Sequence, residues 1–218
     1  LITEFKNSLT AFNAKKKGSF DGKGSINLKI TTMIFKILER SGMKTHFIEN
    51  LDSENMAVRK LEMIPLEVVV RNRAAGSFSH RFAIEEGTLF EKPFVEFYFK
   101  NDALNDPLLT EDHILILKIA KQNEINILKE QALKINDIMA KLFSEIQIHL
   151  VDFKIEFGKN SQGEIVLGDE ISPDSCRLWD AQTGEKLDKD RFRRDLGRVQ
   201  ESYELVLERI EKSKGWLG

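Results

Sequence analysis

The spacing of hydrophobic residues predicts three long helices in this chain. Between residues 24 and 42, apolar side chains recur every three or four positions, and Gly42 provides a helix stop. The same spacing returns from about 121 to 147 and from about 189 to 211. An apolar stripe of this kind is the face that a helix buries against a core. We therefore interpret all three helices as core elements.

Runs of branched and aromatic residues predict strands between these helices. We expect strands at 45–50, 56–63, 66–71 and 94–100, with a turn at Pro65 and a loop at residues 91–93. Two more strands, 149–157 and 164–170, flank a turn at 159–163 and read as a hairpin. This mixture predicts an α+β chain in two lobes, residues 1–90 and 91–218, with the boundary near residues 86–94.

The first strand of the hairpin alternates between apolar and charged side chains. One face takes Val151, Phe153, Ile155 and Phe157. The other takes Asp152, Lys154 and Glu156 without any Ser, Thr or Gln among them. A strand with one solvated face would also alternate, so that interpretation stays open.

The returning strand ends on two carboxylates, Asp169 and Glu170, and the hairpin brings them back beside Lys154 and Glu156. Carboxylates that converge from two paired strands suit a hard cation with oxygen ligands. Magnesium keeps several waters and needs only one or two carboxylates when phosphates complete its shell. Glu156 and Asp169 are therefore the predicted magnesium ligands.

Two further segments carry arginines next to turn-forming residues. VVVRNRAAGS, residues 68–77, is a strand that ends on arginines and continues into a run of small side chains. ISPDSCRLWD, residues 171–180, places Arg177 after a Ser-Pro-Asp turn. Arg177 could serve a ligand, or could simply pair with Asp174 or Asp180.

Charge and composition narrow the classes of function. The 33 basic and 35 acidic residues give a net charge of −2, which argues against a polyanion-binding surface over the whole protein. The basic stretches RNRAAGSFSHR and KDRFRRDLGR raise the alternative of nucleic-acid binding, but the pI near 6.2 counts against it. A single cysteine, Cys176, excludes an internal disulfide and suits a reducing, cytoplasmic location. No apolar run approaches the roughly 20 residues of a membrane span.

Five segments in order resemble the SAICAR synthetase (phosphoribosylaminoimidazole-succinocarboxamide synthase) family. They are VVVRNRAAGS, KNDALNDP (100–107), LVDFKIEFG, LGDEISPDSCRLWD and LDKDRFRRDLG. The resemblance runs from about residue 3 to 211. It implies a two-lobed α+β fold with a kinase-like or ATP-grasp-like nucleotide cleft between the lobes. It also implies an ATP-dependent ligase of purine biosynthesis that joins L-aspartate to CAIR, a phosphoribosyl-aminoimidazole carboxylate.

One family feature has no counterpart in the sequence. Members begin with a strand-turn-strand containing Gly-Lys-Ala-Lys, which covers the nucleotide phosphates, and Leu1 already aligns beyond that turn. We expect an N-terminal piece of this kind to lie before Leu1. A chain without it would bind ATP weakly, and a catalytically silent interaction protein is then an alternative. A small-molecule kinase of the same fold is another.

The resemblance assigns the arginines to a substrate phosphate. Arg71, Ser77 and Arg177 would form a cradle for the ribose 5′-phosphate of CAIR, because a phosphate dianion favours arginine forks supported by hydroxyl groups. The small residues Ala74, Ala75 and Gly76 would let the backbone approach the ligand. Of the two strand-end arginines, Arg73 is the better candidate for a purely structural role.

The resemblance also implies roles around the nucleotide. Glu62 and Met63 are expected at the adenine edge, and Lys100 near the phosphates, with Lys154 adding positive charge. Asp106 either bonds the imidazole or aspartate side of the site or caps a turn. Asp152 and Asp174 are candidate bases for the aspartate amine. The expected ligands are ATP with magnesium, L-aspartate and CAIR, and a homodimer is left open.

Overall fold

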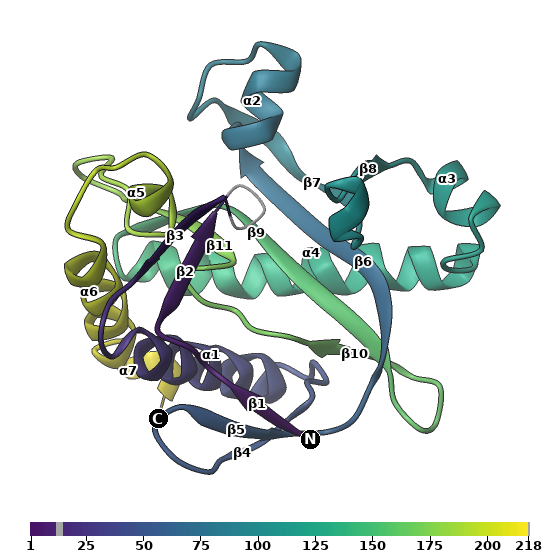
Figure 1. Ribbon diagram of the computed structural model, residues 1–218, viewed down its shortest axis with the longest axis horizontal. Coiled ribbons are helices and arrows are strands. Elements are labelled where there is room, and N and C mark those ends of the chain that lie inside the picture. Colours follow the sequence, from purple (N-terminus) through teal and green to yellow (C-terminus); the bar gives the residue numbers. More distant parts are fainter. Residues whose placement is uncertain (12–14, 218) are drawn as a thin grey trace.

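The computed structural model describes residues 1–11 and 15–217, and a curved antiparallel sheet forms its centre (Figure 1). The strands follow the order β10-β9-β6-β7-β8, and β11 also pairs with β9. Their bounds are β6 (Glu62–Arg73), β7 (Leu89–Phe99), β8 (Leu108–Leu109), β9 (Ile148–Lys159), β10 (Ile165–Gly168) and β11 (Cys176–Asp180). Because β6 lies along one edge of β9 while β10 and β11 share the other, β9 is paired on both sides.

Helices cover this sheet and join it to a smaller one. The long helix α4 (Gln122–Glu145) lies across β6, β7 and β9, and α1 (Lys23–Arg40) packs against α4, α6 (Val199–Glu211) and α7 (Lys214–Leu217). The smaller sheet has the order β1 (Ile2–Glu4), β5 (Asn55–Val58), β4 (Phe47–Asn50). A separate ribbon pairs β2 (Ser8–Ala11) with β3 (Lys16–Ser19). One hydrophobic core runs through α1, α4, α6 and the inner strand faces.

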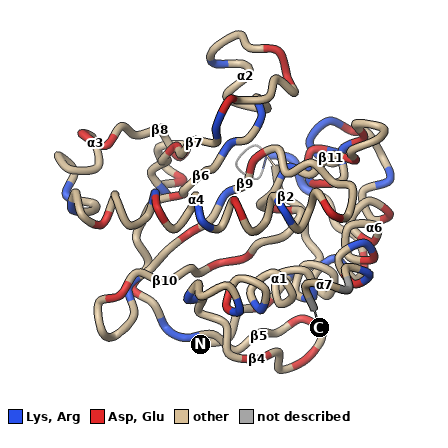
Figure 2. The backbone as a smooth tube through the Cα atoms, turned by 180° about the vertical axis from the view of Figure 1, so that it is seen from behind, with Lys and Arg blue, Asp and Glu red and all other residues tan. Residues whose placement is uncertain are grey.

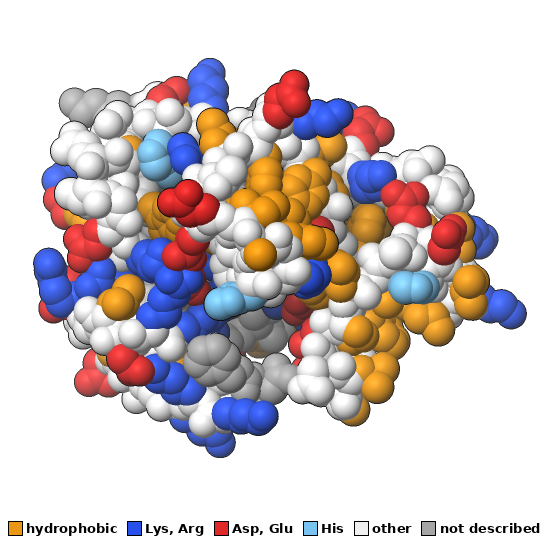
Figure 3. All heavy atoms as spheres, turned by 90° about the horizontal axis from the view of Figure 1, so that it is seen from above, with side chains coloured by type: hydrophobic (Ala, Val, Ile, Leu, Met, Phe, Trp, Pro, Cys, Tyr) orange, Lys and Arg blue, Asp and Glu red, His pale blue; other side chains and the backbone are white. Residues whose placement is uncertain are grey.

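Four short helical segments connect these layers. They are α2 (Gly76–Phe82), the 3-10 turn η1 (Asp102–Leu104), α3 (Glu111–Ile116) and α5 (Asp190–Arg193). α2 stands away from the body at the end of β6 (Figure 1), and none of its residues is buried. Seen from above, hydrophobic side chains gather over this projecting part while Lys and Arg side chains gather beside it (Figure 3).

Two of the three helix predictions and the hairpin prediction are confirmed with small changes. The first two predicted helices are α1 and α4, and the predicted hairpin is β9 and β10. The predicted helix at 189–211 is wrong as a single element. The chain takes left-handed backbone at Asp195, Gly197 and Arg198, which separates α5 from α6.

Two proline positions were also predicted wrongly. Pro65 does not turn the chain, because β6 continues through it and the register with β9 shifts between Met63 and Glu67. Pro93 likewise lies inside β7, at a register shift opposite Arg71 and Arg73. Proline has no N–H for the ladder and is tolerated in a strand at such irregularities. Strand β11 was not predicted at all.

The charged residues do not separate into one acidic and one basic half. Both signs occur along α4 and over the rest of the trace (Figure 2). The division into lobes at residue 90 stays a prediction, since β7 begins at Leu89 and belongs to the same sheet as β6. Among the described residues, no helix is both long and apolar enough to cross a membrane.

Candidate active site

The charged face of β9 is buried, so the alternative of a solvated strand face is wrong. Asp152 and Glu156 are each only 3% exposed, and the side chain of Lys154 is 35% exposed. The apolar residues of the same strand, including Phe153, Ile155 and Phe157, enter the hydrophobic core. Alternation along β9 therefore separates a packed face from a buried polar face, and charges held there must be paired.

Two carboxylates meet at one end of this polar face. Gly168 pairs with Glu156 across the hairpin, so Asp169 follows directly beside Glu156. Burial and the charge of Asp169 raise the pKa of Glu156. Lys100 Nζ donates to both Glu156 oxygens at 2.7 and 2.5 Å. Lys154 Nζ lies 2.6 Å from Glu67 and 3.8 Å from Glu156.

This pair of carboxylates fits a magnesium ion bound together with phosphates. The repulsion from Asp169, which adds to the larger effect of burial in raising the pKa of Glu156, would be relieved by a divalent cation between the two carboxylates. Within the described parts of the chain, no cluster of three or more His, Cys, Asp or Glu side chains could hold a metal alone. Magnesium fits a two-carboxylate site because waters and substrate oxygens complete its shell.

A histidine fixes the backbone of Asp169. Asp169 has a left-handed backbone with φ of 56°, and His46 Nε2 lies 3.1 Å from its carbonyl oxygen. The backbone N–H of His46 donates to Leu167 at 2.9 Å, and its ring packs edge-on against Phe35. Burial lowers the pKa of His46 to about 4, and Arg59 adds to this lowering. The neutral ring can then donate its Nε2 hydrogen to the carbonyl.

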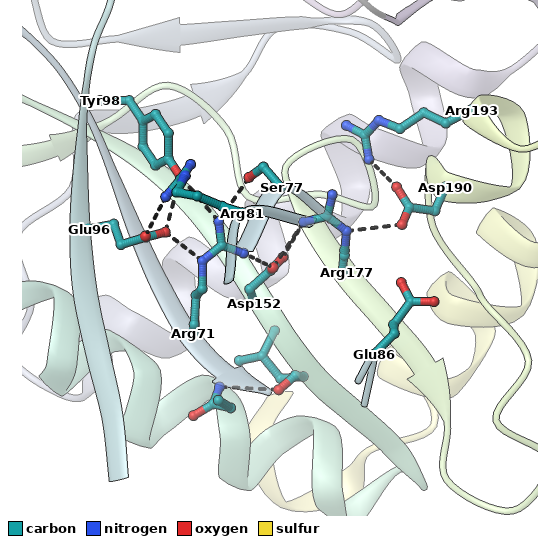
Figure 4. A network of polar contacts seen from close by, with 12 residues as sticks. Arg71, Ser77, Arg81, Glu86, Glu96, Tyr98, Asp152, Arg177, Asp190 and Arg193 are labelled. Atoms are coloured by element: carbon teal, nitrogen blue, oxygen red, sulfur yellow. Dashed lines mark hydrogen bonds and ion pairs between the residues drawn. The ribbon is translucent and has the colours of Figure 1, made fainter. Parts of the chain in front are cut away.

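The other end of the polar face holds a chain of arginines and carboxylates (Figure 4). Arg71, which is 2% exposed, donates from Nε to Glu96 at 2.6 Å and from Nη1 to Asp152 at 2.5 Å. Its Nη2 lies 3.4 Å from both Ser77 and Tyr98. The donors of Arg71 are thus largely taken by the protein itself.

Arg177 approaches the same carboxylate from β11. Its Nη1 donates to both oxygens of Asp152 at 3.0 and 2.9 Å, and its Nε donates to Asp190 at 3.0 Å. Arg193 also reaches Asp190, at 2.6 Å (Figure 4). Although burial works in the opposite direction, Asp152 and Asp190 raise the pKa of Arg177. Arg177 therefore pairs with neither Asp174 nor Asp180, the two partners suggested by the sequence.

The small-residue run after β6 makes room for Arg177. Gly76 has a φ of 54°, and a Cβ there would lie 2.3 Å from Arg177 Nη2. Ala74 and Ala75 are fully buried. The alanine side chains pack inside, and the expectation that these small residues let the backbone approach a ligand stays a prediction. Gly76 instead leaves space for the guanidinium group of Arg177.

Two adjoining cavities lie along this arginine chain. The smaller, about 310 Å³, is lined by residues that include Arg71, Asp152 and Lys154. The larger, about 860 Å³, lies between α2 and α5. Ser77, Arg177 and Arg193 line both. Arg177 Nη2 makes no hydrogen bond in the described part of the protein, which leaves it able to donate into the cavities.

The remaining predicted residues are placed as follows. Leu61 and Met63 pack over two glycines of the hairpin, since a Cβ at Gly158 would lie 2.7 Å from Leu61 and 3.0 Å from Met63. Both Glu62 and Met63 are exposed, Met63 by 42%. The methionine thus has a free surface beside the carboxylate pair.

Asp106 and Asp174 have structural partners. Asp106 accepts a hydrogen bond from the N–H of Asn101 at 2.8 Å. This contact corresponds to turn capping, one of the two roles expected from the sequence. Asp174 is bound by Lys23 at 2.6 Å, Tyr203 at 2.7 Å and Asn27 at 3.1 Å. Its role as a base stays a prediction.

Several residues of the site were not predicted from the sequence. Glu96, Tyr98, Asp190 and His46 each contact a predicted site residue, and Arg193 binds Asp190 and lines both cavities. Asp190 and Arg193 lie in LDKDRFRRDLG, where dense charge beside a helix was the available signal. In the sequence, Glu96 and Tyr98 are recognisable only as polar positions in an aromatic strand. No sequence feature indicates a role for His46.

Comparison with known proteins places this chain in a family. The sequence model of the SAICAR synthetase family matches residues 1–210. The chain is 54% identical to the phosphoribosylaminoimidazole-succinocarboxamide synthase of Wolinella succinogenes, over 96% of this chain and 89% of that protein. The enzyme of the same name from Campylobacter curvus is 56% identical over the same shares.

Solved structures agree over the same length. A crystal structure of the phosphoribosylaminoimidazole-succinocarboxamide synthase of Ehrlichia chaffeensis superposes with a TM-score of 0.94 at 47% identity, covering 96% of this chain and 90% of that one. A SAICAR synthetase in complex with ADP also gives a TM-score of 0.94, at 49% identity, covering 96% and 89%. The backbone that carries the two ends of the site is therefore shared with these proteins.

The lowered pKa of His46 predicts a pH-dependent stability. Below its ordinary pKa of 6.5 the unfolded chain takes up a proton that folded His46, with a pKa of about 4, does not. The stabilising contribution is present above pH 6.5 and is lost as the pH falls, by about 2 kcal/mol between pH 7 and pH 5. The free energy of unfolding of His46→Gln should therefore fall by about 2 kcal/mol less than that of the wild type over this range. Urea unfolding at both pH values measures this, and parallel pH dependence in the two proteins would contradict it.

Proposed function

The chain belongs to the SAICAR synthetase family, and we propose that it carries out the family's reaction on the buried polar face of β9. It is an ATP-dependent ligase of purine biosynthesis, as the resemblance of its ordered motifs implies. The reaction joins L-aspartate to the carboxylate of CAIR and forms SAICAR, ADP and phosphate. One observation carries the assignment to this face: near one end of the polar face of β9, Glu156 lies beside Asp169 and is approached by Lys100 and Lys154, and at the other end Asp152 is bound by arginines.

The nucleotide is assigned to the end with the paired carboxylates. A relative of 49% identity and the same fold was solved with ADP, which supports a nucleotide site in this chain. Glu62 and Met63 would meet the adenine edge, since both are exposed beside the hairpin glycines. Lys100 and Lys154 are already paired with Glu156 and would face the phosphates. Glu156 and Asp169 would hold magnesium.

The chemistry explains why positive charge is gathered here. A carboxylate does not react with an amine directly, because oxide would have to leave. Transfer of the terminal phosphoryl group of ATP to a CAIR carboxylate oxygen releases ADP and gives an acyl phosphate. The aspartate amine then attacks the carbonyl carbon, loses a proton and displaces phosphate. Lys100 and Lys154 neutralise the phosphoryl oxygens as charge moves, and magnesium, when bound, supplies further positive charge to them.

The CAIR phosphate is assigned to the arginine end. Ser77, Arg177 and Arg193 line both cavities, and Arg177 Nη2 has no acceptor in the described chain. Arg71 donates hydrogen bonds to Asp152 and Ser77 and so supports the phosphate cradle from within the protein. A phosphate dianion at this point would add the acceptors that the arginines lack. For an enzyme with these substrates and a single buried cysteine, we also propose a cytoplasmic location.

A coupled assay of ADP release tests the function. The wild type, with magnesium and ATP, should release ADP only when CAIR and L-aspartate are both present. ADP release without aspartate would indicate a small-molecule kinase instead. If all three substrates together gave no ADP and calorimetry detected no ADP binding, the silent interaction protein would be the better account.

Removal of the negative charge from Glu156 or Asp169, the proposed magnesium ligands, should stop turnover. Glu156→Gln and Asp169→Asn each keep the side-chain shape and remove a negative ligand, so binding of magnesium and phosphate should weaken together. We expect loss of turnover and weaker magnesium-dependent binding of ADP by calorimetry, with the fold retained. Glu164→Gln, on the exposed turn of the same hairpin, is the matched control and should remain active. Near-normal activity of either test variant at low magnesium would contradict the assignment.

Removal of the arginines should affect CAIR selectively. Arg177→Ala should raise the KM for CAIR about tenfold to a hundredfold, the loss of one charge-assisted hydrogen bond, while the KM for ATP changes little. Arg71→Ala should act in the same direction and also lower the melting temperature, because it leaves buried Asp152 and Glu96 short of a partner. Arg73→Ala is the milder comparison, since among the residues that the structure describes the Arg73 side chain donates only to the carbonyl of Gly87. Equal changes in KM for ATP and CAIR would assign these arginines to the nucleotide.

A further inference from the structure

The smaller cavity contains one lysine whose charge the described protein does not balance. Five cationic side chains line this cavity: Arg71, Lys154, Arg177, Lys189 and Arg193. Four of them have a carboxylate at hydrogen-bonding distance, and these carboxylates are Glu96, Glu67, Asp152 and Asp190. Across residues 1–11 and 15–217, the ammonium of Lys189 makes neither a hydrogen bond nor an ion pair.

Asp174, the carboxylate with the largest electrostatic effect on Lys189, already has other partners. Asp174 lines the same cavity, but its Oδ2 is bound by Lys23 at 2.6 Å and Asn27 at 3.1 Å, and its Oδ1 by Tyr203 at 2.7 Å. Burial lowers the pKa of Lys189, and Arg193 and Lys23 add to this lowering, whereas Asp174 and Glu170 oppose it. An ammonium group in these surroundings would be stabilised by a further anion in the cavity.

The backbone under Lys189 is fixed on both sides. Its N–H donates to Pro173 at 3.1 Å. The preceding residue, Asp188, is fully buried and accepts the N–H of Leu178 at 2.8 Å and that of Asp190 at 2.7 Å. Lys189 therefore lies on a loop that is hydrogen-bonded to β11. Its backbone would not need to rearrange when a ligand binds to its ammonium group.

We propose that Lys189 binds one of the two carboxylates of the L-aspartate co-substrate. This inference rests on the proposed function, because elimination among the substrate anions selects the ligand. The CAIR phosphate is assigned to Ser77, Arg177 and Arg193. The CAIR carboxylate must face the ATP phosphates near Glu156 and Asp169. The carboxylates of aspartate are the remaining anions, and Lys189 is the remaining unpaired cation of the cavity.

The variant Lys189→Met tests the proposal, because methionine keeps an unbranched apolar side chain and removes the charge. In the coupled assay, the KM for L-aspartate should rise about tenfold or more, equivalent to about 1.4 kcal/mol, while the KM values for CAIR and ATP change little. Lys189→Arg keeps the charge and should recover part of the loss. Lys186→Met is the matched control on the same segment, since Lys186 pairs with Glu86 and does not line this cavity. It should retain the wild-type KM for aspartate.

Other outcomes separate the alternatives. A rise in the KM for CAIR with that for aspartate unchanged would assign Lys189 to CAIR and overturn the proposal. Unchanged kinetics in Lys189→Met would overturn it too, as would a fall in kcat alone at saturating aspartate. If Lys189→Met did not fold by circular dichroism, Lys189→Gln, which also removes the charge but keeps a polar side chain, decides by the same KM ratio. A wild type that released no ADP with CAIR and aspartate would refute the proposed function itself, which these variants do not address.

Discussion

The site depends on one buried carboxylate that two arginines share. Asp152 accepts Arg71 from β6 and Arg177 from β11, and so ties together the strands on both edges of β9. The chain of charges continues through Glu96 to β7 and through Asp190 to α5. Buried charges are tolerated only when each has a partner, and removal of one partner typically costs about 3–5 kcal/mol. The positions of five elements around the cavities are therefore set by a single alternating row of charges.

Strand β9 fixes the position of this row of charges because it is paired with other strands along both edges. Its apolar side chains are part of the hydrophobic core, so the strand cannot rotate or slip without exposing them. A slip of one residue would also exchange Asp152, Lys154 and Glu156 for core residues. The same constraint that stabilises the sheet thus holds the phosphate-side and metal-side groups at a fixed separation along one strand. A reaction between three substrates requires such fixed positions.

Local patterns predicted those parts of the site that a strand imposes on its own residues. Alternation placed Asp152, Lys154 and Glu156 on one face, and the short hairpin brought Asp169 back beside Glu156. The partners were not predictable in this way, since Glu96 meets Arg71 across a paired strand and His46 meets Asp169 from a distant segment. Nothing in the local sequence around Pro65 told a bulged strand from a turn. The family resemblance supplied the substrates. The structure showed that Gly76 leaves space for Arg177 and that Lys189 has no hydrogen-bond or ion-pair partner within residues 1–11 and 15–217.

The most direct measurement is the effect of Lys154→Met on turnover and on melting temperature together. Lys154 lies on the polar face between the two ends of the site, where burial would lower its pKa but Glu67, Glu156 and Asp169 raise it. The substitution keeps the packing of the side-chain stem and removes the charge. If the polar face of β9 carries out the reaction, turnover should fall strongly while the melting temperature changes only a little. Retained turnover would contradict the account, because it would show that the charge of Lys154 takes no part in the reaction.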